Sequence, residues 1–148
     1  MGLNEQLMED LKDAMRKRQE VRVSTIRLAR AAIGNEAIAK GRPLTDEEII
    51  GVFGRQIKQR RESIEEFTKG NRPDLVAREQ EELAILLSYM PQQMTREEII
   101  QAAEATIREV GAQGPSDFGK VMSRLAPQVK GRADGRAVSE IVRELLAR

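Results

Sequence analysis

The sequence contains no cysteine and no histidine. Disulfide bonds, Cys-rich zinc sites, cysteine nucleophiles and Ser-His-Asp triads are therefore excluded. No serine is followed by lysine three residues later, and no Gly-rich Walker or dinucleotide-binding pattern is present. A catalyst would have to be built from Lys, Arg, Asp, Glu and a single tyrosine, so we expect no catalytic residue, no metal site and no cofactor.

Aromatic residues and long apolar runs are also scarce. Aromatics make up 3% of the chain, namely three Phe and Tyr89, which is few for a surface that stacks single-stranded bases. No apolar run approaches the roughly 18 residues of a membrane span, and no signal-peptide pattern opens the chain. We therefore expect no membrane segment and a cytoplasmic location.

The 148 residues are 40% hydrophobic and 33% charged, and their apolar positions recur at helical spacing, without strand-like alternation. Two capping boxes open helices, Thr45–Glu48 and Thr95–Glu98. A boundary is expected near Pro91. The sequence thus predicts an all-α fold, with a four-helix N-terminal domain in residues 1–91 and a small three-helix C-terminal domain in residues 92–148.

The last 33 residues contain two matching apolar stripes. The stripe that begins at Phe118 repeats twenty residues later from Val138, so two amphipathic helices are expected. Pro127 and Gly131 should interrupt the helix between them, and Asp134 is a favourable N-cap for the second.

The loop between these helices combines cations with glycines next to a helix N-terminus, which suits a phosphate group. The alternative is that the glycines only form the turn and the cations are solvated. The candidate RNA-binding residues are Lys120, Lys130, Gly131, Arg132, Gly135 and Arg136.

Net charge is +1, but basic residues gather locally. Residues 116–148 carry seven Lys or Arg against four Asp or Glu, and residues 16–30 carry six against one. Such local excess is compatible with phosphate contact. With so few aromatics, the expected RNA target is the backbone and shape of a folded RNA.

Arg60 falls within the apolar stripe of the third helix, and Glu79 and Glu82 fall within or beside that of the fourth. An unpaired buried charge is costly. We therefore expect Arg60 to pair with Glu79 or Glu82 in a structural role.

Several blocks of this sequence resemble the YqeY family, which is related to the tail domain of GatB, a subunit of the tRNA-dependent amidotransferase. These blocks lie in residues 25–36, 57–67, 89–93, 119–122 and 130–136, and the last is the most specific. Gly34 stands where the family usually has Lys, and Ala126 where Met is common.

The resemblance implies an all-helical, two-part fold whose C-terminal unit helps to hold tRNA, with an aminoacyl-tRNA synthetase or amidotransferase subunit as a possible partner. We therefore expect a non-catalytic tRNA-binding accessory module. Two alternatives remain open: a component with carbon–nitrogen ligase activity that uses glutamine as amido donor, and a protein–protein adaptor that packs its C-terminal helices on a partner.

Overall fold

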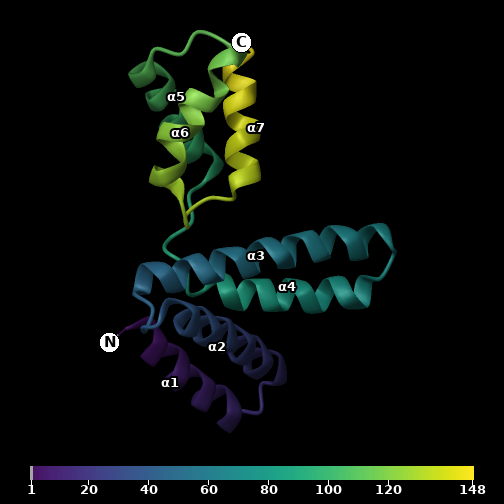
Figure 1. Cartoon of the computed structure of the whole chain (residues 1–148). Coiled ribbons are helices and arrows are strands. Elements are labelled where there is room, and N and C mark those ends of the chain that lie inside the picture. Colours follow the sequence, from purple (N-terminus) through teal and green to yellow (C-terminus); the bar gives the residue numbers. More distant parts are fainter. Residues whose placement is uncertain (1) are drawn as a thin grey trace. The chain divides into compact units, whose positions relative to one another are not determined.

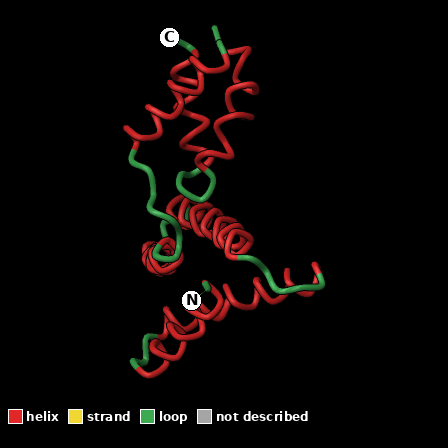
Figure 2. Tube along the Cα trace, turned by 90° about the vertical axis from the view of Figure 1, so that its left-hand side faces the viewer, coloured by secondary structure: helices red, strands yellow, loops and turns green. Residues whose placement is uncertain are grey.

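The structure is a computed structural model that describes residues 2–148, and these residues form helices and loops without a strand (Figures 1 and 2). This confirms the predicted all-α fold. The chain divides into two compact units, one ending at Met90 and the other spanning Pro91–Arg148. We call them the N-terminal and C-terminal units; that each folds as an independent domain stays a prediction. No helix within residues 2–148 is long and apolar enough to cross a membrane.

The N-terminal unit contains four α-helices in the part of the chain that the structure describes. They are α1 (Leu3–Arg16), α2 (Glu20–Lys40), α3 (Asp46–Lys69) and α4 (Pro73–Leu87). Helices α3 and α4 form a long hairpin, α1 packs on α2, and α2 contacts both arms of the hairpin (Figure 1). Phe53 and Leu86 are fully buried at the centre of the core, with Leu7 and Ile26 from the first two helices.

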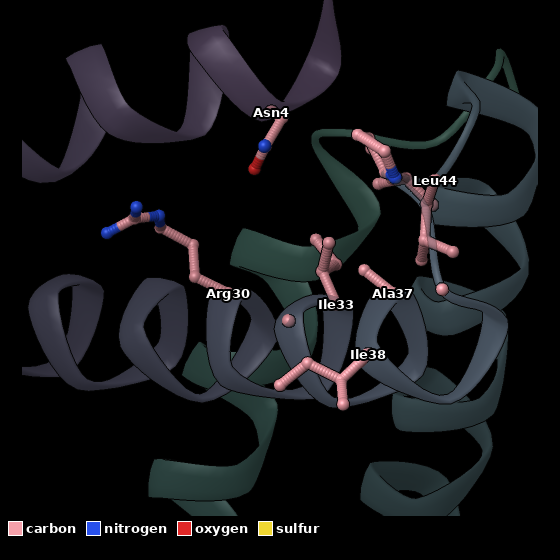
Figure 3. Close-up of a pocket in the computed structure, with 10 residues that line it drawn as sticks. Asn4, Arg30, Ile33, Ala37, Ile38 and Leu44 are labelled. Carbon is pink, nitrogen blue, oxygen red and sulfur yellow. The ribbon is translucent and has the colours of Figure 1, made fainter.

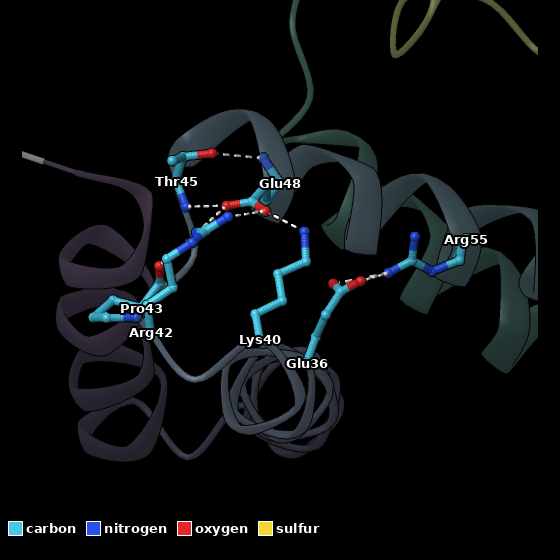
Figure 4. A network of polar contacts seen from close by, with 7 residues as sticks. All are labelled: Glu36, Lys40, Arg42, Pro43, Thr45, Glu48 and Arg55. Atoms are coloured by element: carbon cyan, nitrogen blue, oxygen red, sulfur yellow. Dashed lines mark hydrogen bonds and ion pairs between the residues drawn. The ribbon is translucent and has the colours of Figure 1, made fainter.

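A network of charged side chains closes the corner between α2 and α3 (Figure 4). Gly41 ends α2 in the left-handed region with φ 73°, where glycine is unstrained. The Thr45 hydroxyl accepts from the backbone N–H of Glu48, and the Glu48 carboxylate accepts from the N–H of Thr45 at 2.9 Å. Glu48 also binds Arg42 at 2.7 Å and contacts Lys40. These cations and the capping N–H hold the pKa of the Glu48 carboxyl well below its usual range.

The chain leaving α4 is fixed by Tyr89. Its ring stacks on Phe53 with centroids 5.4 Å apart, and its hydroxyl donates to Asp10 at 2.5 Å. Arg22 completes the cluster, 3.8 Å from Asp10 and 2.9 Å from Asp13. Burial and the Asp10 carboxylate raise the pKa of Tyr89 well above its usual value. No sequence pattern pointed to this cluster, because its members are up to 79 positions apart.

The C-terminal unit packs three helices around its own core: α5 (Arg96–Val110), α6 (Phe118–Val129) and α7 (Gly135–Leu146). A short 3-10 turn, Pro115–Asp117, precedes α6. Each of the three helices contacts the other two. The stripes identified in the sequence supply the buried side chains, including Val121 and Leu125 from α6 and Val138 and Val142 from α7.

One local expectation for this unit was wrong, and another was confirmed in position. Pro127 does not end α6, which continues to Val129. Proline removes one backbone hydrogen bond and crowds the carbonyl four residues earlier, and burial of Val129 favours completing the turn despite this cost. Asp134 does occupy the N-cap position of α7, but its side chain makes no capping hydrogen bond.

Candidate nucleic-acid interface

The candidate loop is a tight reversal between α6 and α7. Lys130 leaves the helix, and Gly131 takes φ 79°, a conformation that side chains with a Cβ rarely adopt. The carbonyl of Val129 accepts from the N–H groups of both Arg132 and Ala133. Gly131 is therefore required by the turn. Gly135 is not: it begins α7 in open space, with no atom within 4 Å of where a Cβ would stand.

The loop is held by the segment that follows Pro91. The N–H of Met94 donates to the Arg132 carbonyl at 2.8 Å. The Gln93 side chain donates to the Gly131 carbonyl at 3.0 Å, and Arg132 Nε donates to the Gln92 carbonyl at 3.1 Å. The sequence indicates only a domain boundary in this segment, so the structural role of Gln93 was not predicted. Its one signal was its place in a block of the family resemblance.

The candidate cations do not all lie in one place. Lys130, Arg132 and Arg136 belong to the loop and the first turn of α7, whereas Lys120 lies at the opposite end of α6, about 15 Å away along the helix axis. Arg132 is half-buried and turned toward the Gln92 carbonyl, while Lys130 and Arg136 are exposed. Within residues 2–148, no carboxylate lies within ion-pair distance of Lys130. The structure thus separates Lys120 from the loop and gives Arg132 a positioning contact.

A groove of about 570 Å³ runs beside this loop between α6 and α7. Its lining is mainly apolar, with Met122, Pro127 and Val138 along the helices and Lys130 and Gly131 at the loop. The first-turn amides of α7 lie next to it, without a side-chain cap from Asp134. Uncapped helix N–H groups carry partial positive charge and bind anions. The arrangement can therefore accept an anionic group at the loop and an apolar group in the groove.

The structure brings together the three side chains of the expected buried ion pair. Arg60 Nε lies 2.9 Å from a Glu82 oxygen and 3.6 Å from a Glu79 oxygen, and all three side chains are at most 18% exposed. Arg78 also reaches Glu82, at 3.3 Å. Glu79 Oε2 and Arg60 Nε are buried without a hydrogen bond, so charge holds Arg60 beside the two acids, whereas Arg78 Nε donates a hydrogen bond to Glu82. Burial raises the pKa of the Glu79 carboxyl, and Arg60 opposes that rise.

In the second basic stretch, residues 16–30, three of the six cations share one carboxylate. Arg16, Lys17 and Arg22 all lie within 3.6 Å of Asp13. Hydrogen bonds from Arg22 and Lys17 lower the pKa of Asp13 to about 2. The pairing with Asp13 therefore covers the N-terminal half of this stretch and leaves out Arg27 and Arg30.

A family model described as Yqey-like protein matches residues 4–146 of this chain. A protein of Pyrenophora tritici-repentis (strain Pt-1C-BFP), named Altered inheritance of mitochondria protein 41, mitochondrial, is 34% identical over 146 residues, covering 95% of this chain and 78% of the relative. The protein of the same name from Lachancea thermotolerans is 33% identical over 150 residues, covering 96% of this chain and 78% of that protein. The one from Saccharomyces cerevisiae (strain YJM789) is 40% identical over 87 residues, covering 58% of this chain and 47% of that protein.

These relatives correct the expected cytoplasmic location. Each carries the word mitochondrial in its name, which points to mitochondria rather than to the cytoplasm. None of the names states a ligand or a reaction.

Proposed function

Because this chain belongs to the YqeY family, matched over residues 4–146, we propose that its C-terminal unit is a non-catalytic module that holds folded tRNA by phosphate contacts. The observation that carries the proposal is the α6–α7 loop, where exposed Lys130 and Arg136 stand beside the uncapped first turn of α7. Cations beside a helix N-terminus favour a phosphate. The resemblance of this loop to the GatB tail favours RNA as the molecule that supplies the phosphate.

The residues of the loop would have two different roles. Lys130 and Arg136 are exposed and would contact phosphates, whereas Arg132 and Gln93 hold the loop against residues 91–94. Lys120 lies at the other end of α6, so it would meet a different phosphate of the same RNA.

The test is a titration of the full chain with tRNA at several salt concentrations. The double variant Lys130→Ala, Arg136→Ala removes two cations, and we expect the slope of log affinity against log salt to fall by about 0.7–0.9 for each lost phosphate contact. Lys58→Ala, Lys69→Ala removes two cations from α3 in the N-terminal unit and serves as the matched control. An unchanged slope in the loop variant would contradict the proposal.

A second variant separates the effect of the loop's position on binding from the effect of its positive charge. Gln93→Ala removes a side-chain donor to the Gly131 carbonyl without changing net charge. We expect weaker tRNA binding with an unchanged salt slope, because the same number of cations still meets phosphates. If affinity is also unchanged, loop position is not part of the binding.

The adaptor alternative finds no support on the C-terminal helices. The large apolar side chains that are at least half exposed within residues 2–148 are Met15, Leu28 and Ile38, and all three belong to the N-terminal unit. No observation favours carbon–nitrogen ligase activity, so we propose no reaction for this chain.

A further inference from the structure

The N-terminal unit contains a second candidate site, a pocket of about 420 Å³ between α1, α2 and the chain that joins α2 to α3 (Figure 3). This volume is within the usual range for ligand sites, and so is a mainly apolar lining with few polar groups. Asn4 and Arg30 stand at one end and Leu44 at the other, with Ile33 and Ala37 along α2.

Gly34 keeps this pocket open. It lies on α2 in the pocket lining, and no atom is within 4 Å of where its Cβ would stand. Ile38, one turn further on, lines the same pocket and is 81% exposed. A large aliphatic side chain left this exposed at the rim of an apolar pocket is typical of a contact surface.

One cation that lines the pocket and one beside it lack acidic partners. Arg30 Nε is buried and has no hydrogen-bond acceptor, and a buried donor without an acceptor costs free energy. Arg27, one turn earlier on the same face of α2, contacts only the sulfur of Met15, at 3.9 Å, among residues 2–148. By contrast, Arg22 and Arg42 have carboxylates at 2.9 and 2.7 Å.

We propose that this pocket binds a helical segment of a partner protein, with an aliphatic side chain entering beside Ile33 and Ile38 and a carboxylate binding Arg30. A second carboxylate one turn away would meet Arg27. The apolar lining and the unpaired guanidinium groups favour an acidic, amphipathic helix. An RNA backbone would leave the apolar pocket empty, and two cations one turn apart are too few to follow it. This surface is independent of the α6–α7 loop.

The test uses a synthetic peptide with capped ends and four Glu-Ala-Ala-Leu repeats, titrated against the full chain by fluorescence anisotropy. We expect saturable binding. The Lys-for-Glu peptide should bind at least about tenfold more weakly, the effect of losing a charge-assisted hydrogen bond. The Arg30→Met variant should lose a similar factor for the acidic peptide, whereas Arg55→Met, which removes a cation already paired with Glu36 at 2.9 Å, should bind normally.

A variant that fills the pocket tests the proposal without destabilising the protein. Gly34→Leu places a side chain in open space on α2 and replaces glycine by a stronger helix former, so it should raise the melting temperature while reducing peptide affinity at least about fivefold. Ile38→Ala should also weaken binding, and Leu28→Ala, an exposed aliphatic residue outside the pocket, is its matched control.

Three outcomes would overturn the proposal. The first is unchanged affinity in Gly34→Leu, and the second is equal binding of the acidic and basic peptides. The third is a different occupant: self-association of the wild type that Gly34→Leu abolishes would identify a second copy, and tRNA binding lost in Arg30→Met and Gly34→Leu would identify RNA.

Discussion

Arg60 meets two carboxylates whose surroundings differ. Glu82 lies 2.9 Å from its Nε and also contacts Arg78, whereas Glu79 lies at 3.6 Å and has one buried oxygen without a hydrogen bond. Burial raises the pKa of Glu79, which means that the folded state disfavours its ionised form near neutral pH. The sequence predicted a pair, but it could not rank the two acids.

The difference gives a prediction from matched variants. At pH 7, Glu82→Gln should lower the free energy of unfolding by about 1–3 kcal/mol, because it removes the acid closest to the buried Arg60. Glu79→Gln should cost clearly less, since it removes a carboxylate that is costly to ionise there. Urea denaturation of both variants measures this, and equal losses would contradict the ranking.

Because of Asp13, the free energy of unfolding of the N-terminal unit should decrease at low pH. Its pKa falls from 3.8 to about 2 because Arg22 and Lys17 hydrogen-bond to the ionised form. The unfolded state therefore takes up this proton at a higher pH than the folded state, so the contribution of Asp13 is complete above about pH 4 and is lost as the pH falls toward 2.

Asp13→Asn should accordingly destabilise the protein at pH 7 and make progressively less difference as the pH is lowered from 4 to 2. The urea midpoints of the two proteins across this range are the measurement. A gap between them that does not change with pH would show that Asp13 acts through something other than its charge.

At the scale of elements, the helices begin in two ways. Thr45 and Thr95 cap α3 and α5 with the same backbone conformation, φ −73° and ψ 164°, and each is paired with a glutamate three residues on. Helix α7 has Asp134 at the same position but no side-chain cap. The capping threonines accept from the amides of Glu48 and Glu98, whereas α7 begins without such a side-chain cap.

Thr45→Ala and Thr95→Ala should each destabilise the protein by about 1 kcal/mol through loss of the capping hydrogen bond. The corresponding serine variants keep a hydroxyl and should recover most of that loss. Hydrogen exchange of the amides of Glu48 and Glu98 measures the effect locally, and unaltered exchange in the alanine variants would count against the capping role.

At the scale of the whole molecule, the described chain has two cores without a shared residue. Leu86 and Leu125 are both fully buried, the first in the N-terminal core and the second in the C-terminal core. Each helix contributes to one core only, because the apolar stripes of α1–α4 and of α5–α7 pack within their own unit. This organisation predicts that the units unfold separately.

Leu86→Ala and Leu125→Ala form a matched pair for this prediction. Each should destabilise its own unit by about 2–5 kcal/mol, the usual cost of a cavity left by leucine. Hydrogen exchange should then increase in residues 2–90 for the first variant and in residues 91–148 for the second. Faster exchange throughout both units in either variant would indicate a single cooperative domain.

Much of the fold could be predicted because helix formation here is governed by near neighbours in the chain. The capping box at Thr45 lies within four residues and the stripe at Val138 within nine, so both are readable from the sequence. The predictions were wrong or incomplete where the local structure depends on residues far away in the sequence. Pro127 stays helical because Val129 is buried against other helices, and Tyr89 is fixed by Phe53 and Asp10 from elsewhere in the unit.

The candidate sites, too, have features that can be predicted from the sequence and features that depend on the tertiary structure. The sequence by itself determined that the chain is helical, that it lacks cysteine and histidine, and that cations cluster near Lys130, because these properties depend on composition and local order. Only the tertiary structure decided that Gln93 holds the loop, that Lys120 lies apart from it, and that Arg30 faces an open pocket at Gly34. Those facts depend on which helix faces meet, and side chains far apart in the sequence acquire their partners only when the helices pack.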